Sequence, residues 1–117
     1  MATSDTVADY FSHLKQGIGW ESFLADDMVF TSFTTPVKQL IGRAAYLQST
    51  KRFYSMIKGF EVCKVIVDGE NVCALTRYEL QPPAGPLFQS NVAEVFGVRD
   101  GKITSFDIYF DSSPFPK

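Results

Sequence analysis

Apolar residues near the start of the chain recur at intervals of three and four: Val7, Tyr10, Phe11 and Leu14. This spacing is typical of an amphipathic helix, and we predict one over 5–16 that ends at Gly17. A short helical turn over 20–24 and a strand over 28–33 should follow it. A second helix is predicted over 43–58, where one stripe is apolar and the opposite side is polar, and Gly59 should close it.

After Gly59 the pattern changes to short runs in which apolar residues alternate or cluster. Glycine and proline interrupt these runs at 68–69, 81–86 and 100–101, which indicates turns. The expected strands cover 60–67, 72–80, 87–98 and 103–110. Helices followed by a series of antiparallel strands predict one α+β domain over 1–117, with the helices packed on one face of a strongly curved antiparallel sheet.

Glu94 interrupts an apolar face of the expected strand 87–98. Side chains on a strand alternate between its two faces, so this carboxyl shares a face with the following residues: Phe88, Ser90, Val92, Phe96 and Val98. A lone ionised carboxylate among apolar groups is costly, so Glu94 should find a partner, reach water or stay protonated. Arg77, Lys64 and Tyr10 are possible structural partners, and a bulge could instead turn the side chain outward.

The last turn sets which residue lies opposite Glu94. A three-residue loop over 99–101 would place Glu94 opposite Phe106, whereas a two-residue loop would place it opposite Asp107. We expect the first register, because it puts Phe106, Ile108 and Phe110 on the face that carries Phe88, Val92 and Phe96.

Composition narrows the classes of function. The chain has 117 residues, 45% of them hydrophobic, including 11 Phe and 5 Tyr, so an aromatic interior is expected. A net charge of −2 and the absence of a basic cluster argue against binding to nucleic acid or an anionic membrane. With neither a signal peptide nor a run of ~20 apolar residues, a cytoplasmic location is expected. One histidine and two cysteines (His13, Cys63 and Cys73) are too few for a zinc site, so we expect free thiols, no metal and no cofactor.

The order of the expected elements resembles the nuclear transport factor 2-like fold, the superfamily of ketosteroid isomerase and the SnoaL-like polyketide cyclases. Five stretches carry the resemblance: 10–14, 20–27, Gly42-Arg43, 98–103 and 106–111. The resemblance implies a cone-shaped, cystatin-like α+β barrel whose apolar interior holds a small molecule. It also implies a homodimer formed through the sheet.

The resemblance also suggests roles for three residues. Ketosteroid isomerases combine an aspartate base with an oxyanion hole formed by a tyrosine and a protonated aspartate. Those two donors fall on Tyr10 and Glu94, and the position of the base falls on Ser32. A serine is not a general base near neutral pH unless a partner takes its proton. We therefore expect Tyr10 and Glu94 as candidate catalytic residues in a site that lacks the usual base.

The expected ligand-binding residues are Ser32 together with apolar and aromatic side chains: Phe30, Phe53, Met56, Tyr78, Phe88, Phe96, Phe106 and Ile108. Two functions remain open. One is an enzyme of the isomerase or cyclase class that acts without a metal, and the other is a non-catalytic ligand-binding or dimeric association module. A cavity of ~300 Å³ or more, lined by Glu94 and a second titratable group, would favour the enzyme.

Overall fold

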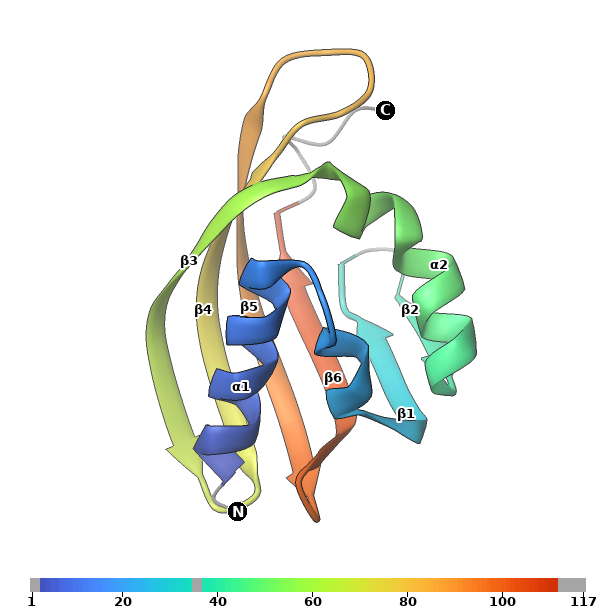
Figure 1. The fold of residues 1–117 in the computed structure, drawn as a ribbon, viewed down its shortest axis with the longest axis vertical. Coiled ribbons are helices and arrows are strands. Elements are labelled where there is room, and N and C mark those ends of the chain that lie inside the picture. The colour runs from blue at the N-terminus through green and yellow to red at the C-terminus, as the bar shows by residue number, and fades with distance from the viewer. Residues whose placement is uncertain (1–2, 35–36, 112–117) are drawn as a thin grey trace.

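The computed structural model describes residues 3–34 and 37–111, which form a curved sheet with both helices on its concave side (Figure 1). The elements in chain order are α1 (Thr3–Gln16), the 3-10 helix η1 (Trp20–Phe23), β1 (Leu24–Ser32), β2 (Lys38–Ile41), α2 (Arg43–Met56), β3 (Ile57–Asp68), β4 (Asn71–Leu80), β5 (Phe88–Arg99) and β6 (Lys102–Phe110). The predicted α+β class is confirmed. Neither α1 nor α2 is long and apolar enough to cross a membrane, and no other described helix is.

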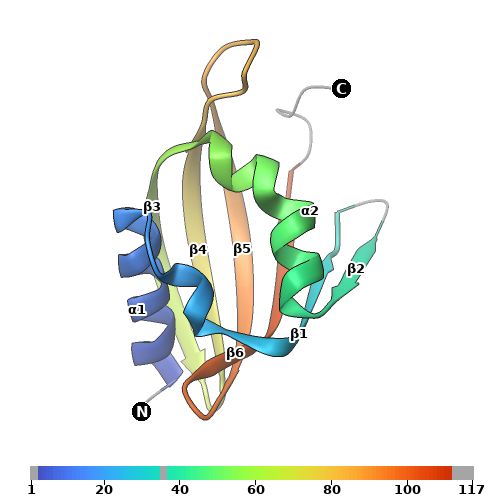
Figure 2. The same ribbon diagram turned by 45° about the vertical axis from the view of Figure 1, so that its right-hand side comes forward.

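The sheet is mixed rather than purely antiparallel, and it does not close into a barrel. Its six strands follow the order β2-β1-β6-β5-β4-β3, and only the β1–β6 pair is parallel. After α2 the chain enters the sheet at its far edge and returns by hairpins until β6 reaches β1 (Figure 2). Because β1 and β6 meet after this long crossover, they run in the same direction.

Two predicted boundaries differ from the structure, and one strand was missed. The strand β1 begins at Leu24, directly after η1, and not at residue 28. The helix α2 ends at Met56, because Ile57 has extended backbone angles and already pairs with Leu80 at the start of β3. Gly59 therefore lies inside a strand rather than at a helix end. The strand β2 was not predicted, since it is only four residues long and begins with two exposed polar side chains.

The predicted register of the last hairpin is wrong, and so is the alternative with Asp107. Asp100 and Gly101 both have positive φ (53° and 74°), so they form a two-residue turn that pairs Arg99 with Lys102. A bulge next to Gly97 then adds one residue on β6, and Glu94 lies opposite Ile108. Because of this extra residue, Phe106 and Ile108 lie on the same face of the sheet as Glu94, as the sequence predicted.

Aromatic side chains fill the part of the concave side that α1 covers. Tyr10 and Phe11 from α1 pack against Phe96 of β5, and the Phe96 and Phe106 ring centroids are 4.4 Å apart. Leu24 and Ile103 close the narrow end of this cluster, where β1 meets β6. The α1 half of the molecule is thus a packed core, and the open space lies under α2.

Candidate functional site

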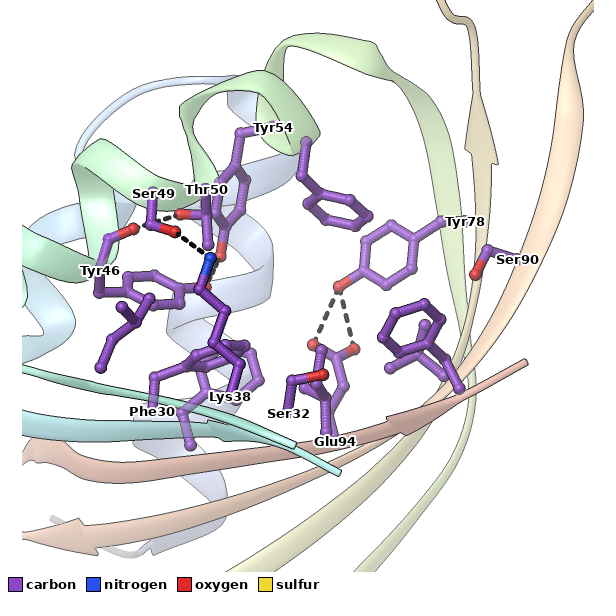
Figure 3. Close-up of a pocket in the computed structure, with 16 residues that line it drawn as sticks. Phe30, Ser32, Lys38, Tyr46, Ser49, Thr50, Tyr54, Tyr78, Ser90 and Glu94 are labelled. Atoms are coloured by element: carbon purple, nitrogen blue, oxygen red, sulfur yellow. Dashed lines mark hydrogen bonds between the residues drawn. The ribbon is translucent and has the colours of Figure 1, made fainter. Parts of the chain in front are cut away.

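A pocket of about 210 Å³ lies between α2 and the concave face of the sheet (Figure 3). Its walls come from β1, β2, α2, β4, β5 and β6. The volume is below the ~300 Å³ at the lower end for pockets that hold drug-sized ligands. Any molecule it encloses is therefore small, of the order of one or two fused rings.

Seven of the eleven predicted site residues line this pocket: Glu94, Ser32, Phe30, Phe53, Tyr78, Phe106 and Ile108. The other four, Tyr10, Met56, Phe88 and Phe96, lie outside its lining. Met56 and Phe88 belong to a second apolar cluster with Leu80 and Val92, and Phe96 is completely buried in the cluster under α1. Period-two alternation identified the correct face, but it could not say which part of that face is covered by α1.

Glu94 sits at the floor of the pocket and is only 2% exposed. It lies in the middle of β5, between Ala74 of β4 and Ile108 of β6. Its partner is Tyr78, whose hydroxyl donates to Oε1 at 2.9 Å and to Oε2 at 3.0 Å. The carboxyl is therefore held by a neighbouring tyrosine, and neither Arg77, Lys64 nor Tyr10 takes that place.

The surroundings of Glu94 favour its neutral form. Burial raises the pKa of this carboxyl from 4.5 to about 7, while the hydroxyl groups of Thr76 and Tyr78 act in the opposite direction. A group with a pKa near 7 is present in both protonation states at neutral pH. Glu94 can therefore both accept and donate a proton, as general acid–base chemistry requires.

Three tyrosines form a chain of hydroxyl groups on the α2 side of the pocket; Tyr10 and Tyr46 are buried, and Tyr54 is half-buried. The Tyr54 hydroxyl is 2.9 Å from that of Tyr10 and is also hydrogen-bonded to that of Tyr46. Burial raises the pKa of all three phenols well above its ordinary value, so they stay protonated near pH 7. Tyr46 and Tyr54 line the pocket, whereas Tyr10 reaches it only through Tyr54. Tyr54 was expected on the inner stripe of the second helix, and the spacing of eight residues, which places Tyr46 near the same face, was the available signal for Tyr46.

The rim of the pocket is polar, and sequence reasoning missed it because β2 was not predicted. Lys38 of β2 lies opposite Ser32 of β1, and its Nζ donates to Ser49 Oγ of α2 at 3.2 Å. Lys38, Ser49 and Thr50 all line the pocket. Lys38 therefore adds a basic side chain to a pocket lining that already holds Glu94 and tyrosine hydroxyl groups. The pocket is nevertheless smaller than the ~300 Å³ that would favour an enzyme.

Deeper in the pocket, the hydroxyl of Ser90 faces the space beside Tyr78 (Figure 3). Ser90 is 1% exposed, and its Oγ has no hydrogen-bond partner among the described residues. An unsatisfied buried hydroxyl loses the hydrogen bonds it would make in water. A ligand with a donor or acceptor at this point would restore one of them.

The remaining candidates lie away from the pocket. Cys63 and Cys73 are free thiols, and Asp107 pairs with Val95 outside the pocket lining. His13 is half-buried, with its Nδ1 3.2 Å from the carbonyl oxygen of Ile18. Within 3–34 and 37–111, no three His, Cys, Asp or Glu side chains gather as a metal site would require.

Several solved structures are similar to this chain in fold along most of its length. A protein from Kribbella flavida has a TM-score of 0.80 and 22% identity, over 95% of this chain and 88% of that one. A candidate SnoaL-like polyketide cyclase from Mesorhizobium loti has a TM-score of 0.76 and 22% identity, and the match covers 93% of this chain and 99% of that one. A candidate isomerase from Bacillus subtilis has a TM-score of 0.79 and 18% identity, and the match covers 95% of this chain and 90% of that one. At these identities the likeness establishes the fold.

No curated protein matches the sequence significantly. The family model of the SnoaL-like domain, however, matches residues 7–106, which include most of α1, all of α2, Glu94 and most of the pocket lining. The chain therefore belongs to the SnoaL-like domain family.

Proposed function

We propose that the chain binds a small, mostly apolar molecule in the pocket under α2 and that Glu94 transfers a proton to or from it. The observation that carries this proposal is the buried Glu94 carboxyl, with a pKa of about 7, at the floor of a pocket whose walls are mainly aromatic and aliphatic. The reaction class is an isomerisation or cyclisation that passes through an enol or enolate.

In this proposal Glu94 takes the role that Ser32 cannot fill. Its ionised form removes a proton from the carbon next to a carbonyl group, and its neutral form returns the proton to another atom of the same molecule. The Tyr78 hydroxyl, bonded to both oxygens, holds the carboxyl in one orientation.

The tyrosine chain supplies a donor for the oxygen of such a ligand. Three hydroxyl groups share two hydrogen bonds, so one O–H is left over. If the bonds run from Tyr10 to Tyr54 to Tyr46, the spare hydrogen belongs to Tyr46, which lines the pocket. A protonated phenol in a buried site stabilises the negative charge that develops on a carbonyl oxygen.

Proton transfer can be tested without knowing the natural substrate. The probe is 2-tetralone in D₂O, and NMR follows the replacement of its α-protons by deuterium. We expect the native chain and Glu79→Gln, which neutralises an exposed carboxyl on β4, to accelerate exchange alike. Glu94→Gln should abolish the acceleration while the ketone still causes chemical-shift changes in pocket residues. If the native chain binds the ketone without accelerating exchange, the catalytic part of the proposal is wrong.

A second candidate function is association through the convex face of the sheet, in a homodimer. Three large apolar side chains on that face are solvent-exposed: Ile66 (50%), Leu75 (37%) and Tyr109 (50%). Phe33 stacks on the Tyr109 ring at 4.7 Å between centroids. Burying such a surface against a second copy would remove apolar area from water. Sedimentation of the purified chain measures this directly, and a monomer at all concentrations would contradict it.

A further inference from the structure

The side chain of Lys38 places a positive charge at the mouth of the pocket. It comes from the edge strand β2, is solvent-exposed, and reaches across to Ser49 on α2. No described carboxylate lies within ion-pair distance of its Nζ; the described ion pairs involve Arg43, Arg77 and Arg99. The charge of Lys38 is therefore not compensated by this part of the chain.

The groups around Lys38 have hydrogen-bonding capacity to spare. An ammonium group has three N–H donors, and Ser49 takes one of them. The Ser49 hydroxyl accepts that bond and keeps its own hydrogen to donate. The rim thus offers a cation and a hydroxyl donor close together, which is the combination that a carboxylate group needs.

The polarity of the pocket gives such a ligand an orientation. At the floor an ionised carboxylate would lose its hydration and lie near Glu94, which carries partial negative charge at pH 7. At the rim the same group stays near water and meets Lys38. Between the two ends the walls are largely apolar, with Phe30, Leu40 and Phe106 among them.

We propose that the ligand of this pocket is a small amphipathic carboxylic acid, whose carboxylate binds Lys38 and Ser49 while its apolar body extends toward Glu94. A single lysine provides one positive charge, so it matches a carboxylate better than a phosphate dianion. This inference rests on the proposed function, because it concerns the ligand of the same pocket, but it is tested by binding and not by proton transfer.

The test compares two probes of nearly equal shape, 4-ethylbenzoate and 4-ethylbenzamide, by NMR titration at low ionic strength. We expect the native chain to bind the benzoate roughly fivefold more tightly, the effect of one partly exposed charge contact. Lys38→Met should remove the preference and leave amide binding unchanged, and Lys38→Arg should retain it. Lys64→Met removes an exposed lysine of β3 and should behave as the native chain.

The outcomes separate this inference from the function on which it rests. If neither probe shifts the resonances of pocket residues, the proposed ligand-binding function is contradicted. If both bind equally to the native chain, or if the preference survives in Lys38→Met, the role of Lys38 is overturned and binding itself stands. Tighter binding of 4-ethylphenyl phosphate than of the benzoate would overturn the choice of a carboxylate. The spectrum of Lys38→Met outside the pocket shows whether that variant has folded.

Discussion

Replacing Glu94 by glutamine should make the protein more stable, and by an amount that depends on pH. Glutamine has the same shape as a protonated glutamate, and its side-chain carbonyl can still accept from Tyr78. It has no charged form to bury. The comparison therefore isolates the cost of ionising this one carboxyl inside the fold.

The magnitude follows from the shift of the pKa from 4.5 to about 7. Each unit of difference between the folded and unfolded states is worth about 1.4 kcal/mol, so the full cost is about 3 kcal/mol. The folded state holds the proton more tightly than the unfolded state. Below pH 4.5 both states are protonated and there is no cost. Between pH 4.5 and 7 the unfolding free energy falls, and above pH 7 the loss is complete.

Urea unfolding of both variants at several pH values measures this difference. Trp20 is the only tryptophan, and it stacks on Tyr54 at 4.2 Å, so its fluorescence should report the loss of structure beside the pocket. The advantage of Glu94→Gln should grow by about 1 kcal/mol per pH unit between pH 5 and 7 and level off above pH 7. Asp107, whose pKa burial also raises, is present in both variants, so its titration cancels. A difference between the two variants that does not change with pH would refute the reasoning.

Two further predictions concern the sheet. Gly97→Ala should destabilise the fold by roughly 1–3 kcal/mol, because a Cβ there would lie 2.3 Å from Ser105 Oγ. Adding Ser105→Ala should recover most of the lost thermal stability. An unchanged melting temperature in Gly97→Ala would contradict the close approach at the bulge. Leu75→Arg places a charge on the exposed convex face and should shift a self-associating chain to the monomer in sedimentation, with the melting temperature at low concentration little changed. Dissociation by Glu79→Gln as well would show that the effect is not specific to that apolar surface.

The sequence was sufficient to place Glu94 on the concave face, because alternation along β5 does not depend on the rest of the fold. Its partner was not predictable in the same way. Tyr78 lies opposite Ser90 on the neighbouring strand, and that register is set by the connection 81–87, whose length fixes no turn type. The register of the β5–β6 hairpin was not predictable either. One extra residue at the bulge changes which residues lie opposite each other, while each side chain stays on the face of the sheet that was predicted.

The contributions of the helices and of β2 to the site were also hard to predict from the sequence. The resemblance placed Tyr10 in the site, but a side chain of α2, Tyr54, occupies the space between Tyr10 and the pocket. How deeply α2 inserts depends on tertiary packing, which helical spacing does not describe. Lys38 was missed because a four-residue edge strand with polar side chains has no periodic signal. Most parts of the site found from sequence lie on β1, β4, β5 and β6, with Phe53 of α2 as the exception, whereas Lys38, Tyr46 and Tyr54 on β2 and α2 were missed.

The energetic cost of Glu94 is itself an argument about its role. A leucine at this position would bury apolar area among Phe96, Phe106 and Ile108, and a phenylalanine at position 78 would need no partner. Replacing such a buried polar pair with apolar side chains is often neutral or stabilising. The pair is also incompletely satisfied as a structural element, because one hydroxyl hydrogen is divided between two carboxyl oxygens, at 2.9 and 3.0 Å. Lone pairs of the carboxyl therefore remain unused at the floor of the pocket. An arrangement that lowers stability and leaves hydrogen-bonding capacity facing a pocket is better explained by a bound molecule than by architecture.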